Sequence, residues 1–469
     1  MQARFAHILV AAAHILVPLC GCLSERSHPM NSARLVRLAA DDSLTGASTV
    51  RAWLEQAEAQ LRPLLPALQK TPLTTAGLST AVGRARDVYA YFDRDPRFLH
   101  TLFCNLDGLQ QTAQCVGADT TGTEPMPAWP DFEDVWVPVR EDLQLFGRLG
   151  LARQGGSIAN TTCVVVLPGL FGSLSVMRTR DVCEGLRQAG YHALAIELRG
   201  TGRTGIRYPQ WPCNFGTTET GDLLAVSEWL ENRPNVRNTG LIGFCWGANE
   251  ALLTAYEDGR PADHPSITPQ LQKFMPPRTG RPHFTAGVLA FSPVLAFEEL
   301  MDKFERSYDT VANPVLAGLE ETIRFRASNQ GFTGVGGNFR RLIRAEVNRT
   351  PGAYPTYMED GLRYLRLMRY ETLPDYDKLE CARVPTLIVH AANDPLSPAD
   401  RVAQQMARVQ NPNVAALMLP GGGHDGFSAY ARDYTFSLIV SFFDGHAGAA
   451  AVLRPRTAAV LTHSTSNHR

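Results

Sequence analysis

The spacing of hydrophobic positions changes near residue 132. Residues 135–139 and 143–147 alternate apolar and polar side chains, as two paired antiparallel strands do. Residues 163–167 (CVVVL) form a continuous, largely β-branched run, which is typical of a strand buried on both faces of a parallel sheet. The pattern therefore predicts that a large sheet begins in this part of the chain.

Strands and helices alternate through most of the remaining chain. The pattern predicts helices over residues 176–189, 222–231, 249–256 and 430–443, and strands over residues 193–196, 241–244, 287–291, 386–390 and 415–419. This alternation favours an α/β fold in which helices cover both faces of a doubly wound, mostly parallel sheet.

Three further segments do not follow the alternation. Residues 23–131 combine a polar tether (24–47) with helical spacing from about 48 to 103, and a Gly-, Thr- and Pro-rich linker (116–131) follows. Residues 297–372 form a mostly helical insertion, expected to be a lid on a domain spanning 132–446. Residues 447–469 are expected to be a loosely ordered tail.

The first residues are typical of an export signal. Residues 5–19 are apolar but too short to span a bilayer, and they end in Leu19-Cys20-Gly21-Cys22, which resembles the bacterial lipobox. This interpretation makes 1–22 a signal peptide with a lipobox and Cys22 the site of lipid attachment. The protein would then be an exported bacterial lipoprotein, anchored to the membrane. Only Arg4 supplies positive charge before the apolar run, and Cys20 is unusual there. The alternative is a start at Met30 and a cytoplasmic protein.

The composition excludes several classes of protein. Hydrophobic residues make up 44% and charged residues 19% of the 469 residues, as in a globular protein with a large core. The formal net charge of −1 offers no basic face for nucleic acid. A soluble enzyme is the favoured class, with its oligomeric state left open. Cys104 and Cys115 could pair if the protein is exported.

The most informative motif is Gly243-Phe244-Cys245-Trp246-Gly247, which lies between a predicted strand and a predicted helix. Such a turn forces its central residue into a strained conformation and raises its side chain to the top of the sheet. Small residues on both sides are needed to avoid backbone clashes. A cysteine alone is often an ordinary core residue, but this context makes Cys245 the candidate nucleophile.

A candidate acid and a candidate base follow in the chain. Asp394 stands after the strand predicted at 386–390, and His424 lies in a glycine-rich loop after the next strand. The order nucleophile, acid, base predicts that His424 takes the thiol proton and that Asp394 orients the imidazole. Asp425 is a competing acid, although adjacent side chains rarely point at one another as this role requires.

An oxyanion hole is also predicted. The sequence LPGLFGS at 167–173 follows the first buried strand. The backbone N–H of Leu170, together with that of Trp246, could donate to a developing oxyanion.

Taken together, these motifs resemble the α/β hydrolases. The resemblance is to the YheT-type branch, which includes plant embryogenesis-associated proteins and mammalian abhydrolase-domain lipases, and it covers about residues 132–446. It is carried by PGLFGS at 168–173, RGTG at 199–202, GFCWGAN at 243–249, DP at 394–395 and GGHDGF at 422–427. It implies the α/β-hydrolase fold and an esterase-, lipase- or phospholipase-like activity.

The chain departs from that family at two positions. Pro168 replaces the usual histidine before the oxyanion glycine, and Cys245 replaces the usual serine. Dienelactone hydrolases and polyhydroxyalkanoate synthases, related in fold, do use cysteine there. The expected function is a carboxylic-ester hydrolase, without cofactor or metal, that acts on a small-molecule ester or lipid through a Cys-His-Asp triad and a thioester. The alternatives are an acyltransferase or polyester synthase on the same triad, and an inactive lipid-anchored binding protein.

Overall fold

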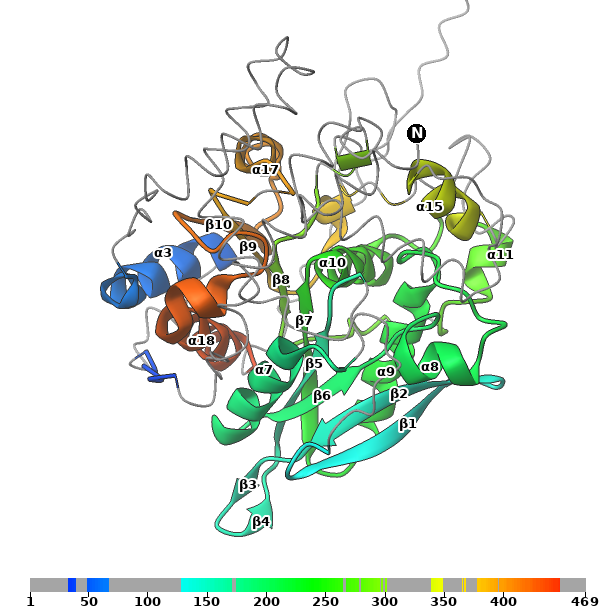
Figure 1. Cartoon of the computed structure of the whole chain (residues 1–469), viewed down its shortest axis with the longest axis horizontal. Helices are drawn as coiled ribbons and strands as arrows, with labels where there is room; N and C mark the ends of the chain where they lie inside the picture. Colours follow the sequence, from blue (N-terminus) through cyan, green and yellow to red (C-terminus); the bar gives the residue numbers. More distant parts are fainter. Residues whose placement is uncertain are drawn as a thin grey trace, which may run out of the picture.

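An eight-stranded sheet forms the centre of the protein in a computed structural model (Figure 1). Its strands lie in the order β1-β2-β6-β5-β7-β8-β9-β10. They are β1 (Phe132–Arg140), β2 (Leu143–Gly150), β5 (Thr161–Leu167), β6 (His192–Ile196), β7 (Val236–Phe244), β8 (Val288–Phe291), β9 (Thr386–Ala391) and β10 (Val414–Leu419). Strand β2 pairs antiparallel with β1 and β6, and every other pair in the sheet is parallel. The predicted doubly wound, mostly parallel α/β fold is therefore confirmed.

The structure describes residues 33–38, 49–66, 128–170, 174–264, 267–277, 280–295, 297, 300–301, 339–348, 365, 367, 378–394 and 396–447. The predicted signal peptide with Cys22, the helical pattern at 83–89, Cys104, Cys115, most of the predicted lid and the tail after residue 447 lie outside these residues. Within the described part of the lid, residues 339–347 are helical.

Helices lie on both faces of the sheet (Figure 1). The described helices are α3 (Val50–Leu61), η2 (Arg62–Leu64), α7 (Met177–Gln188), α8 (Gly202–Arg207), α9 (Glu219–Glu231), α10 (Trp246–Gly259), α11 (Pro269–Gln272), α15 (Phe339–Val347), η4 (Lys378–Cys381), α17 (Ala399–Met406) and α18 (Phe427–His446). A short hairpin, β3 (Arg153–Gln154) and β4 (Ser157–Ile158), lies apart from the main sheet. None of these helices is long and apolar enough to cross a bilayer.

Strand β5 shows why the sheet needs helices on both faces. Its side chains alternate between two hydrophobic clusters: Val165 belongs to the cluster formed with α9 and α10, and Val164 to the cluster formed with α3, α7 and α18. Both side chains are fully buried. A continuous apolar run is therefore required here, because each face of the strand enters a different core.

Several parts of the structure differ from the predictions. Residues 33–38 fall within the predicted tether, yet they lie along α18: the Val36 N–H donates to Ser437 Oγ over 2.9 Å, and Arg37 forms an ion pair with Asp444 at 2.8 Å. This segment is therefore held by partners far away in the sequence. Helix α17 was not predicted, although its buried residues Val402 and Met406 stand one helical turn apart.

Candidate active site

Cys245 lies in a strained turn between β7 and α10. Its backbone has φ 54° and ψ −120°, in the left-handed half of conformational space that non-glycine residues rarely adopt. Its N–H donates to the carbonyl of Phe291 in the neighbouring strand β8 over 2.9 Å. The turn therefore presents the Cys245 side chain at the carboxyl end of the central strands, directly before the positive N-terminal end of α10.

The two glycines of the motif are required by close backbone contacts. A Cβ on Gly243 would lie 2.2 Å from the carbonyl oxygen of Gly247, and a Cβ on Gly247 would lie 2.2 Å from that of Pro168. A Cβ on Gly169 would lie 3.1 Å from Cys245 Cβ. The loop after β5 is therefore packed directly against the turn that holds Cys245.

Replacing Gly243 by alanine is expected to disrupt this turn. The added methyl group meets backbone atoms that cannot rotate away, so we expect a loss of about 3 kcal/mol or more in the free energy of unfolding. Chemical denaturation measures this loss. Gly155→Ala is the control: it has open space and should cost only about 1 kcal/mol through its left-handed backbone. Equal losses for the two variants would show that the contact at Gly243 is unimportant.

His424 and Asp394 form a buried hydrogen-bonded pair. Nδ1 of His424 lies 2.9 Å from Oδ2 of Asp394, and both residues are about 95% buried. The other oxygen of Asp394 accepts the N–H groups of Leu396 and Ser397, over 2.8 and 3.0 Å. Asp394 is thus held rigidly with one oxygen directed at the imidazole.

These contacts decide the charges of the pair. Burial alone would raise the pKa of Asp394, but His424, His390 and the Ser397 N–H outweigh it and lower that pKa to about 2. Burial alone would lower the pKa of His424, but Asp394, Cys245 and Asp425 raise it well above its ordinary value. Asp394 is therefore ionised at neutral pH, and the site favours an imidazolium at His424.

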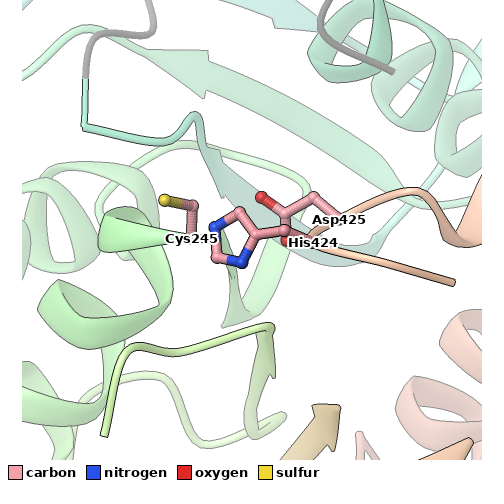
Figure 2. Close-up of side chains that lie close together, drawn as sticks. All are labelled: Cys245, His424 and Asp425. Atoms are coloured by element: carbon pink, nitrogen blue, oxygen red, sulfur yellow. The ribbon is translucent and has the colours of Figure 1, made fainter. Parts of the chain in front are cut away.

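Asp425 is close to the site, but its carboxylate is not the hydrogen-bond partner of His424 Nδ1. Its carboxylate forms an ion pair with Arg178, at 3.4 Å, while His424 Nδ1 bonds to Asp394. Figure 2 shows Cys245, His424 and Asp425 gathered together, and their sulfur, nitrogen and oxygen atoms lie within 4.8 Å of one another. These three donors are of the kind that Zn²⁺ accepts. The positive charge of Arg178 opposes a cation there.

Sequence reasoning missed the residues that hold the histidine loop. The side-chain oxygen of Asn393 accepts the Gly423 N–H over 2.9 Å, and Ser292 Oγ accepts the Asp425 N–H over 3.1 Å. His424 is therefore held from both sides. Asn393 could have been noticed because it directly precedes Asp394, and Ser292 because it directly follows a predicted strand.

The two residues predicted to form the oxyanion hole, Leu170 and Trp246, come from different elements on either side of Cys245. Trp246 is the first residue of α10, and Leu170 follows the glycine that approaches Cys245. The indole N–H of Trp246 donates to the Phe215 carbonyl over 3.1 Å, which fixes the start of the helix. Phe171, Gly172 and Ser173 of the same motif lie outside the described residues.

Two other motif residues support the fold. Arg199 is buried and forms an ion pair with Asp222 of α9 through two nitrogens. Asn249 of α10 exchanges hydrogen bonds with the main chain of Val294, over 2.7 and 3.1 Å. These side chains attach the loops around the site to α9 and α10.

The sequence is similar to those of known proteins. A family model described as the alpha/beta hydrolase fold matches residues 162–428. Embryogenesis-associated protein EMB8 of Picea glauca is 22% identical over 317 residues, which cover 66% of this chain and 62% of that protein. The chain thus spans less than two thirds of this relative's length.

Solved structures with a related fold include two esterases. Esterase Pf2001 of Pyrococcus furiosus is 17% identical with a TM-score of 0.41, over 68% of this chain and 97% of that one. Est1E of Butyrivibrio proteoclasticus is 15% identical with a TM-score of 0.37, over 66% and 95%. Likeness at this level concerns the fold alone.

The family model covers more than half of the chain, and it confirms the predicted class of enzyme, a hydrolase built on this fold. The chain therefore belongs to the alpha/beta hydrolase fold family.

Proposed function

We propose that this protein is a carboxylic-ester hydrolase that uses Cys245 as nucleophile, His424 as base and acid, and Asp394 as the group that orients the imidazole. One observation carries the proposal. The strained turn at Cys245 and the hydrogen-bonded His424–Asp394 pair meet at the carboxyl ends of β7, β9 and β10. A nucleophile, a base and an oriented carboxylate in one place are the requirements of acyl transfer through a covalent intermediate.

The first half of the proposed reaction acylates the thiol. The Cys245 sulfur, its proton transferred to His424, attacks the ester carbonyl and forms a C–S bond. The resulting oxyanion accepts hydrogen bonds from the N–H groups of Leu170 and Trp246. When the C–O bond breaks, the His424 imidazolium donates its proton to the departing alkoxide, and the alcohol leaves.

The second half returns the free enzyme. His424 takes a proton from water, which attacks the thioester carbon, and the C–S bond then breaks. The carboxylic acid leaves, and the Cys245 thiolate is restored beside the protonated His424. Asp394 keeps Nδ1 of His424 protonated throughout, so that Nε2 is the nitrogen that exchanges protons.

The raised pKa of His424 leads to a prediction about leaving groups. Deprotonation of His424 removes the general acid, so kcat/KM for an ethyl ester should fall as pH rises through that pKa, well above the ordinary histidine range near pH 6.5. A p-nitrophenyl ester with the same acyl group should not show this fall, because p-nitrophenolate leaves without a proton. Profiles of kcat/KM from pH 5 to 10 make the comparison. The same alkaline fall for both esters would contradict the role of His424 as the acid.

The activity itself is tested with p-nitrophenyl and glyceryl esters of increasing acyl length, with Cys245→Ala as the control. Release of free acid by the natural protein and not by the variant supports the proposal. The absence of release, together with a Cys245 thiol that iodoacetamide does not label at neutral pH, favours the inactive binding protein.

Acyl transfer is the second candidate, because a thioester can pass its acyl group to an alcohol as well as to water. Adding glycerol during turnover separates the two reactions. A new ester formed in preference to free acid would identify a transferase.

A further inference from the structure

Asp425 is a buried carboxylate that the proposed reaction does not use. It is only 3% exposed, and its oxygen lies within 4.8 Å of Cys245 Sγ and of a ring nitrogen of His424. Oδ2 faces Nη1 of Arg178 at 3.4 Å, and Oδ1 has no hydrogen-bond partner among the described residues. An ionisable group in this position must influence the charge of the nucleophile, since little water screens it.

We infer that Asp425 and Arg178 form a buried ion pair whose two charges set the pH range in which the Cys245–His424 pair loses its protons. This inference rests on the proposed function, because it concerns the same nucleophile and base.

Both members of the ion pair are held in place by the fold. The Arg178 guanidinium carbon lies 4.3 Å from the ring centroid of Phe244, and Nη1 also lies 3.4 Å from the main-chain oxygen of Asp425. The side chains of Arg178 and Asp425 are 9% and 4% exposed. Asp425 has φ 64°, and its N–H donates to Ser292 Oγ. Helix α7, strand β7 and the residue directly after β8 thus fix one charge of each sign beside the nucleophile.

The direction of each effect follows from charge alone. The groups facing the Cys245–His424 pair are Asp425, Arg178 behind it, and Asp394 with His390 beside it at 3.8 Å. Every proton that leaves the thiol or the imidazolium makes the pair more negative by one. A nearby negative charge therefore moves the loss of the thiol proton and of the imidazolium proton to higher pH. A nearby positive charge moves both to lower pH.

The pKa of Asp425 reflects the same neighbours. Burial raises this pKa, Arg178 and His424 lower it, and Asp394 raises it, so that on balance it lies above its ordinary value. Asp425 in turn is one of the groups that raise the pKa of His424. Asp425 and Arg178 have opposite effects on the pH at which Cys245 and His424 lose their protons. Removing either charge should therefore shift that pH.

The test is the pH dependence of alkylation at Cys245. Iodoacetamide reacts with the thiolate, and the modified peptide that contains Cys245 is quantified by mass spectrometry, which separates it from the other thiols. Compared with the natural protein, the midpoint of the rate profile should move to lower pH by about one unit in Asp425→Asn and to higher pH by about one unit in Arg178→Met. Arg180→Met is the matched control, since Arg180 lies on the same helix and pairs with Glu184 at 35% exposure. Its midpoint should not move.

A double variant covers the case in which one single variant fails to fold. Arg178→Met with Asp425→Asn removes both charges, so its midpoint should return close to that of the natural protein. Far-ultraviolet circular dichroism of each variant establishes that it is folded. Unchanged midpoints in the folded single variants, or shifts in the same direction for both, would overturn the inference. Alkylation does not require ester turnover, so the absence of esterase activity with opposite shifts present would overturn the proposed function alone.

Discussion

Cys245→Ala is expected to lower kcat/KM for the best ester substrate by about 10⁴-fold or more, with the fold intact. The alanine removes the sulfur that forms the thioester in the proposed reaction, whereas the strained turn is retained because its glycines and backbone contacts do not involve the sulfur. Steady-state kinetics and a thermal melt of the same preparation measure the two parts of this prediction.

Two further variants make the Cys245→Ala result specific. Cys245→Ser should keep measurable turnover, because the turn suits either nucleophile. Cys381→Ala is the matched thiol control: Cys381 is also a half-buried cysteine, located in η4, and its loss should leave kcat/KM within about twofold. Full activity in folded Cys245→Ala would remove Cys245 from the mechanism and leave the fold assignment untouched.

Asp394→Asn is expected to lower kcat by about 10⁴-fold. The amide can still accept the N–H groups of Leu396 and Ser397, so the local backbone should be preserved. It cannot stabilise an imidazolium as a carboxylate does, and its NH₂ group facing Nδ1 would select the wrong tautomer of His424. Single-turnover measurements of acylation, with a thermal melt for stability, test this prediction.

The control for Asp394→Asn is Asp400→Asn, six residues further along the chain on the exposed side of α17. This change removes the same charge far from any imidazole that the site uses, so kcat should be unchanged. Comparable activity in the Asp394 and Asp400 variants would show that the carboxylate of Asp394 is not the acid of the site.

The sequence alone was sufficient to predict the layered architecture. Runs such as 163–167 are apolar at every position because both faces of a central parallel strand are buried, and this requirement is visible in the residues themselves. The turn at Cys245 could be predicted for a similar reason. The clash that excludes side chains at Gly243 arises from backbone only four residues away, so the constraint is local.

The sequence also predicted which residues would meet, although not how they would be held. Cys245, Asp394 and His424 each follow a predicted strand, and parallel strands end at the same edge of a sheet. Their spacing could not show that Ser292 and Asn393 hold the loop on either side of His424, because those hydrogen bonds depend on loop conformations. The choice between Asp394 and Asp425 as the partner of His424 likewise needed the position of the imidazole.

Contacts between distant parts of the chain were decided by the tertiary structure alone. Arg178 and Asp425 are 247 residues apart, and residues 33–38 lie along α18, which begins almost 400 residues later. Such pairs leave no periodic signal, because one charged side chain on a helix or in a loop is compatible with solvent exposure until the fold buries it. Hydrophobic periodicity records which face of an element is covered, whereas the identity of the covering residue is set only when the elements pack.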